Sequence, residues 1–178
     1  TLQLNGNNLD LSGIDVKMEL GTGLVLDGVS TGTNTTLLLT ADSTLTSSSP
    51  YTLGSINLQN KELTLGSATS DLTVSGAVTF DTSGSHLLTG SADLTLQSAL
   101  ALVSGKLTST AGVLTLAQGA TLGEGAVFDF SGSTVKLNGT LDADNGTVNS
   151  NNRSTIELQA ASSISSNAEF TLATLNLN

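Results

Sequence analysis

The chain has 178 residues and a formal net charge of −10, from 15 acidic and 5 basic residues. This acidity makes nucleic acid and anionic membrane surfaces poor partners. The sequence has no Cys and only one His, which excludes disulfide scaffolds, thiolate metal sites and cysteine nucleophiles.

The composition is biased and repetitive, with 27 Thr, 24 Ser, 19 Gly and 32 Leu. Only 11% of residues are charged, against about 25% in ordinary soluble domains. A mean hydropathy of +0.17 indicates enough aliphatic surface for a core. The longest apolar stretch, residues 99–103, has 5 residues, far short of the ~20 that a spanning helix needs. We therefore expect a chain that does not span a membrane.

The first 52 residues alternate apolar and polar positions without a constant repeat, and we interpret residues 1–52 as coils of less regular length. Residues 46–52 hold the sole Pro and the sole Tyr, which predicts an outward loop or a coil corner. No linker divides the chain, so we expect one solenoid over residues 1–178. The chain starts with Thr and shows no leader pattern, which favours a piece of a longer protein or a processed product.

Residues 53–178 are more regular, and short apolar segments recur there in three columns with steps of about 21 residues. The first column contains Leu72-Thr73-Val74, Leu94-Thr95-Leu96, Leu114-Thr115-Leu116, Val135-Lys136-Leu137, Ile156-Glu157-Leu158 and Leu175-Asn176-Leu177. The second contains residues 56–58, 78–80 and 100–102, then Leu122, Leu141 and Ile164. The third contains residues 63–65, Leu87, Leu107, residues 128–130, Val148 and residues 170–172.

Each column alternates apolar and polar residues, which predicts three short strands per coil. Gly-containing turns separate the strands. A β-sandwich would vary its strand and loop lengths, whereas a β-solenoid stacks like positions at a constant step. The sequence therefore predicts an all-β, right-handed parallel β-helix of roughly eight coils. Five residues of the first column are expected to stack in register: Leu72, Leu94, Leu114, Val135 and Ile156.

No motif of an enzyme or a metal site stands out, and we expect no catalytic, cofactor-binding or metal-binding residues. His86 is the only imidazole and lacks a recognisable triad pattern in the sequence. The segment from Asp142 to Gly146 resembles the start of an EF-hand loop, but Arg153 stands where the closing Glu is needed. The basic residues are scattered, and column stacking places Lys136 beside Glu157 as an expected ion pair.

Two further surface features have structural explanations. The outward row Thr73, Thr95 and Thr115 suggests an ice-binding array, yet it continues as Lys136, Glu157 and Asn176. The frequency of Thr is better explained by its preference for strands. Four Asn-x-Ser/Thr sequons leave glycosylation open; they begin at Asn34, Asn138, Asn145 and Asn152.

Residues 113–148, VLTLAQGATLGEGAVFDFSGSTVKLNGTLDADNGTV, resemble the passenger β-helices of bacterial autotransporters, filamentous-haemagglutinin-like adhesins and other large repetitive surface proteins. The resemblance is clearest over residues 53–178 and lies in repeated Leu-Thr-Leu and Asn-Gly-Thr-Leu motifs. It implies secretion to the cell surface and a rigid shaft, with binding or spacing roles carried by loops or by other domains.

The expected function is therefore structural, as a β-solenoid segment of a bacterial extracellular fibre, without enzymatic activity. The alternative is a carbohydrate-binding or polysaccharide-degrading β-helix, which a groove with three or more Asp, Glu, Arg or His side chains would support. Strand-like segments near both ends, Leu2-Gln3-Leu4 and residues 170–177, predict uncapped edges. These edges are expected to meet copies of the chain or flanking coils, and host or matrix glycans are a further expected partner class.

Overall fold

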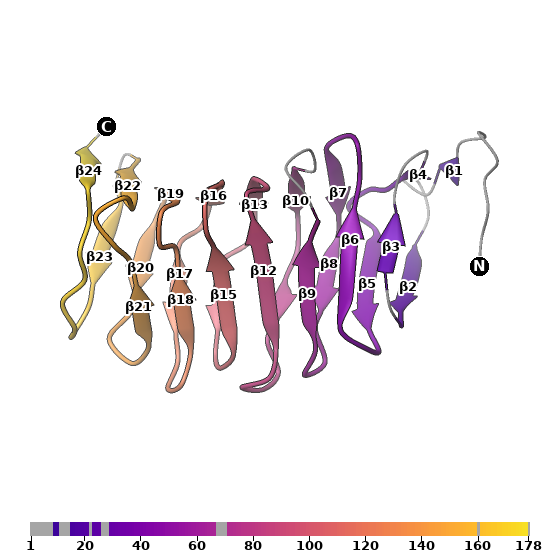
Figure 1. Cartoon of the computed structure of the whole chain (residues 1–178), viewed down its shortest axis with the longest axis horizontal. Helices are drawn as coiled ribbons and strands as arrows, with labels where there is room; N and C mark the ends of the chain where they lie inside the picture. Colours follow the sequence, from indigo (N-terminus) through magenta and orange to yellow (C-terminus); the bar gives the residue numbers. More distant parts are fainter. Residues whose placement is uncertain are drawn as a thin grey trace.

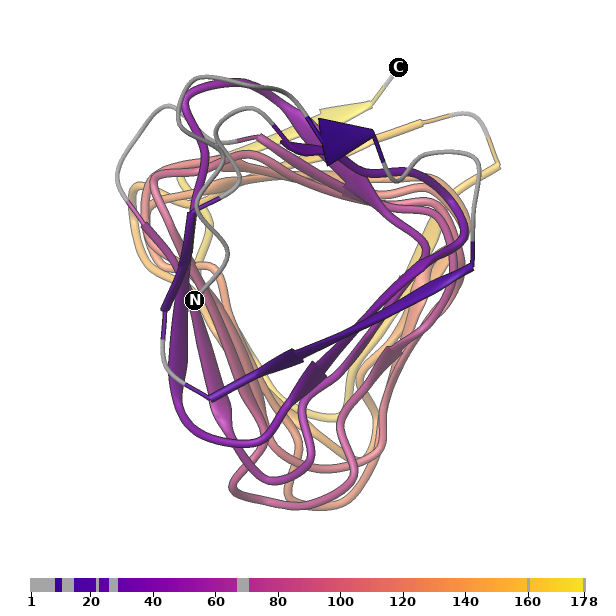
Figure 2. The ribbon, with the colours of Figure 1, turned by 90° about the vertical axis from the view of Figure 1, so that its right-hand side faces the viewer.

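The computed structural model describes residues 9–10, 15–21, 23–25, 29–66, 71–159 and 161–177. They form a parallel β-solenoid of about 7 turns with about 20 residues per turn, drawn out along one axis (Figure 1). Seen end-on, the winding chain has a three-sided outline (Figure 2). In this part of the chain no helix has the length and apolar character to cross a membrane.

The three sides of the solenoid are built from strands of two to five residues, and all of their pairings are parallel. Side A is one sheet of β7 (Tyr51–Leu53), β10 (Leu72–Val74), β13 (Leu94–Leu96), β16 (Val113–Leu116), β19 (Thr134–Leu137), β22 (Thr155–Leu158) and β24 (Thr174–Leu177). Side C is one sheet of β3 (Gly23–Val25), β6 (Ser43–Thr46), β9 (Glu62–Leu65), β12 (His86–Gly90), β15 (Lys106–Ser109), β18 (Val127–Asp129) and β21 (Thr147–Asn149).

Side B consists of two sheets. The first holds β2 (Val16–Leu20), β5 (Thr35–Leu39), β8 (Ser55–Asn57) and β11 (Val78–Thr79), and the second holds β14 (Leu100–Leu102), β17 (Ala120–Leu122), β20 (Thr140–Asp142) and β23 (Ser163–Ser165). A further short pair joins β1 (Leu9–Asp10) to β4 (Val29–Ser30).

The register of side A confirms the predicted first column. Leu94 pairs with Leu72 and Leu114, and the series continues through Val135 to Ile156. All five side chains are buried. One inward side chain per coil therefore stacks on its equivalent in the next coil, which makes the core a continuous apolar column. The all-β parallel solenoid predicted from the repeat is confirmed.

The structure departs from the expected regularity in the coil between β11 and β14. These two strands lie close together but belong to different sheets, so the second column is interrupted. In the same coil, the pairing of β12 with β15 shifts register between Leu88 and Gly90. Gly90 has a φ of 59°, which is typical of the glycine in a β-bulge. The register shift on side C and the interrupted pairing on side B thus occur in the same coil.

Three further expectations concern the number of coils, the segment 46–52 and residues 170–172. The described residues form about 7 turns, against roughly eight expected for all 178 residues, and the positions near Leu2 and Leu4 lie outside the described part. Of the two alternatives for residues 46–52, the coil corner fits and the single outward loop does not, because β6 ends at Thr46 on side C and β7 begins on side A with the buried Tyr51. Residues 170–172 form no strand, although Phe170 and Leu172 pack against the core.

Serine hydroxyls line one corner of the solenoid and replace backbone hydrogen bonds that the turns leave open. Ser109 Oγ lies 2.8 Å from Ser133 Oγ, one coil away, and both residues are buried. Ser154 Oγ donates to the Phe130 carbonyl at 3.0 Å and accepts from the Gly132 N–H at 3.1 Å. These contacts satisfy polar groups that would otherwise be costly to bury.

Candidate functional site

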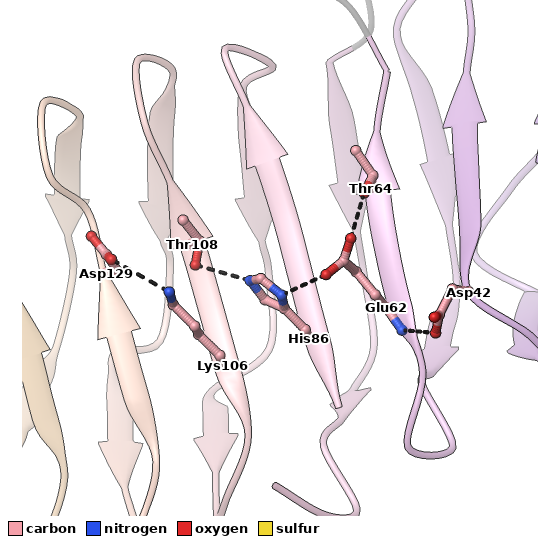
Figure 3. Close-up of polar contacts among 7 residues, drawn as sticks. All are labelled: Asp42, Glu62, Thr64, His86, Lys106, Thr108 and Asp129. Carbon is pink, nitrogen blue, oxygen red and sulfur yellow. Dashed lines mark hydrogen bonds and ion pairs between the residues drawn. The ribbon is translucent and has the colours of Figure 1, made fainter. Parts of the chain in front are cut away.

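The outer face of side C carries a row of polar side chains that connects successive coils (Figure 3). We call this row the side C ladder; its members are Asp42, Glu62, Thr64, His86, Lys106, Thr108 and Asp129. The parallel register creates the row, because His86 pairs with Glu62 on one side and with Lys106 on the other. Residues at equivalent positions of neighbouring coils therefore face solvent next to one another.

His86 is the centre of the ladder and bonds to one residue in each of the two neighbouring coils. Its Nδ1 atom lies 2.9 Å from Glu62 Oε2, and its Nε2 atom lies 3.0 Å from Thr108 Oγ1. The carboxylate can only accept, so Nδ1 carries a proton, and in the neutral ring Nε2 accepts from the Thr108 hydroxyl. The side chains of His86 and Glu62 are 22% and 44% exposed, which makes this a partly solvated pair.

The remaining contacts extend the ladder to other coils. Glu62 Oε1 accepts from the Thr64 hydroxyl at 3.2 Å, and the Glu62 N–H donates to Asp42 Oδ1 at 2.9 Å. Lys106 Nζ lies 3.6 Å from Asp129 Oδ2. The cationic and anionic groups thus neutralise one another along the sheet instead of converging on one point in space.

The order hydroxyl, imidazole, carboxylate is also that of a hydrolytic triad, so its chemistry must be weighed. Thr108 is buried, with 7% of its surface exposed, and its hydroxyl is already directed at the His86 ring. A hydroxyl in this position is poorly placed to attack a substrate. The geometry fits a cross-link between strands better than it fits a nucleophile.

Sequence reasoning missed this ladder, although the register contained the signal. His86 stands in no motif of its own, but Glu62 and Lys106 lie 24 residues before it and 20 residues after it, close to one coil in each direction. The predicted neighbours Lys136 and Glu157 do pair in register. Their side chains, however, form none of the ion pairs found in the described part of the chain.

The other surface positions lie where the columns predicted. The outward row of side A runs from Thr52 through Thr73, Thr95 and Thr115 and then becomes Lys136, Glu157 and Asn176. All four sequon residues are exposed: Asn34, Asn138, Asn145 and Asn152.

A hollow of about 400 Å³ lies beside the end of the ladder. It is bounded by Asp129, Ser131, residues 148–150 and residues 169–171. Asp129 and Glu169 are its two carboxylates, fewer than the three charged or imidazole groups that would support sugar-cleaving chemistry. Among the described residues no three His, Asp or Glu side chains gather as a metal site would require.

The strand β24 forms the last edge of side A. Its Leu175 and Leu177 are 51% and 76% exposed. No family model matches the chain, and comparisons with curated proteins and with solved structures found no match.

Proposed function

We propose that this chain is a structural β-solenoid segment of a bacterial extracellular or cell-surface fibrous protein, acting as an adhesin shaft or as a filament subunit that stacks end to end. Its function is to provide length, stiffness and resistance to proteases. Placement outside the cell and kinship with autotransporter or haemagglutinin shafts rest on the sequence resemblance.

The observation that carries the proposal is the in-register stacking of side A up to an open edge. Seven strands pair in succession there, and β24 presents a free strand edge beside exposed Leu175 and Leu177. Such an edge is a template for another strand. A following coil of the same polypeptide, or the first coil of another copy, would bury both leucines. Contact between unlike ends propagates into a filament instead of closing.

The side C ladder supports the same function, because it links neighbouring coils without collecting reactive groups. Each contact of the ladder is modest, on the order of 0.2–1 kcal/mol, but contacts recur over several coils. The alternative, a carbohydrate-binding or polysaccharide-degrading protein, has weaker support, since the hollow contributes only two carboxylates. We propose that the chain has no enzymatic activity.

The test is the assembly state of the purified chain, followed by light scattering and electron microscopy as its concentration is raised. We expect rods one solenoid wide that lengthen by end-to-end addition. Leu177→Lys should shift assembly to higher concentration by about tenfold, because it places a charge in the new contact. The matched control is Val103→Lys, since Val103 is 66% exposed and lies on a different part of the surface. A monodisperse monomer at all concentrations, or equal effects of the two variants, would contradict end-to-end stacking.

A further inference from the structure

Two turns in the described part of the chain contain an asparagine followed by a glycine. Asn138-Gly139 connects β19 to β20, and Asn145-Gly146 connects β20 to β21. Both asparagines are exposed, and neither side chain forms a hydrogen bond with another described residue. Such a pair is chemically labile, because no Cβ on the glycine hinders its backbone nitrogen from attacking the asparagine side chain. The two pairs differ in how the fold holds that nitrogen.

The backbone of Gly139 is held on both sides by the following coil. Its N–H donates to Ser162 Oγ at 3.2 Å, and its carbonyl accepts from the Ser163 N–H at 3.1 Å. Ser162 Oγ is fixed in turn, because it donates to the Leu137 carbonyl at 2.7 Å. The nitrogen of Gly139 can therefore turn toward the side chain of Asn138 only after its hydrogen bond breaks.

The nitrogen of Gly146 has no such restraint. Gly146 is partly exposed, and its N–H forms no hydrogen bond with another described residue. The backbone is fixed only at the next residue, where the Thr147 N–H donates to the Ala126 carbonyl at 2.9 Å. A Cβ at position 146 would overlap the side chain of Leu122, so the packing of the coils requires a glycine after Asn145. The fold thus maintains a labile pair and leaves its reacting nitrogen free.

We propose that Asn145 is a site of spontaneous deamidation, whereas the fold protects Asn138. The Gly146 nitrogen loses its proton to water and bonds to Cγ of Asn145, the Cγ–Nδ2 bond breaks, and the amide group leaves as ammonia with a proton from water. Water then opens the resulting succinimide ring at either carbonyl and yields aspartate or isoaspartate. Either product adds one negative charge to a net charge of −10. The modification is independent of the proposed shaft function and would accumulate with the age of the chain.

The test incubates the whole folded chain at mildly alkaline pH and follows both asparagines by tandem mass spectrometry. Trypsin cuts after Lys136 and after Arg153, so a single peptide, residues 137–153, contains both sites. We expect Asn145 to react at least about fivefold faster than Asn138, the factor that one protecting hydrogen bond supplies. The same peptide incubated free in solution lacks the fold, and there the two rates should be similar.

Two variants test the cause of the difference. Ser162→Ala removes the acceptor of the Gly139 N–H, so it should speed the reaction of Asn138 about fivefold and leave the rate at Asn145 unchanged. Asn145→Gln should abolish the reaction at its position, because the longer side chain would have to close a larger ring. The proposal would be overturned by equal rates in the folded chain, by no reaction at Asn145, or by the same rate difference in the free peptide. An unchanged rate of Asn138 in folded Ser162→Ala would overturn the protective role of the hydrogen bond.

Discussion

Nδ1 of His86 lies 2.9 Å from Oε2 of Glu62, one coil away, and the two side chains are partly exposed. Replacing both in a double-mutant cycle, with His86→Ala and Glu62→Gln, should give a coupling of about 0.2–1 kcal/mol in the free energy of unfolding. Urea unfolding measures it. The matched control is Lys136→Ala with Glu157→Gln, since this pair shares the register but forms no ion pair. Equal couplings would show that the ladder contact adds nothing beyond proximity.

The apolar column gives a stronger prediction. Leu114 is fully buried between Leu94 and Val135, so Leu114→Asp would place a charge among aliphatic side chains without a partner. We expect a loss of about 4 kcal/mol or more in the free energy of unfolding. Thr115→Asp, at the adjacent outward position, should cost less than about 1 kcal/mol. Similar thermal stabilities of the two variants would contradict the inward placement of Leu114.

The fold was predictable from the sequence because each coil repeats the same inward positions, so a register error would turn a whole apolar column outward. The inward residues of side A illustrate this, since they stack in register from Leu72 to Ile156 and are all buried. The bulge at Gly90 was not predictable, since one glycine among 19 carries no signal of its own. Pro50 signals the corner between β6 and β7 but not where the next strand begins, and Tyr51 is already part of β7, as suits an aromatic residue.

The side C ladder shows a different limit of sequence reasoning. The stacking of Lys136 on Glu157 was inferred correctly from the column, but register fixes only which residues are neighbours. Whether two neighbouring side chains meet depends on their rotamers and on competing partners. His86, for example, pairs in register with Lys106 but forms its hydrogen bond with Thr108. Residues 170–172 were predicted as a strand of the third column but form none, because an apolar, strand-like pattern does not ensure pairing with β21.

Two glycines with similar φ angles allow two costs of a Gly→Ala substitution to be measured separately: the backbone strain at positive φ, and the steric overlap of the added Cβ with a neighbouring coil. Gly105 and Gly125 have φ angles of 82° and 80°. A Cβ at Gly105 would overlap the Ser85 carbonyl and lie 2.8 Å from that of Thr82, whereas a Cβ at Gly125 would meet nothing within 4 Å. Gly125→Ala should cost about 1 kcal/mol from the left-handed backbone alone. Gly105→Ala should cost at least twice as much, and equal melting temperatures would argue against this close coil contact.

Tyr51 provides a test of the core near β7, because it is the sole tyrosine and its absorbance reports on no other residue. Burial raises the pKa of its hydroxyl above the ordinary value, which is about 10 in an unfolded chain. The folded state therefore keeps the proton that the unfolded state loses, so stability should be complete below pH ~10 and fall as the pH rises above it. The hydroxyl also has no hydrogen-bond partner among the described residues. Tyr51→Phe should accordingly stabilise the fold by about 1 kcal/mol and reduce its sensitivity to alkali. Tyrosinate absorbance that develops near pH 10 while the circular dichroism remains native would place Tyr51 outside the core.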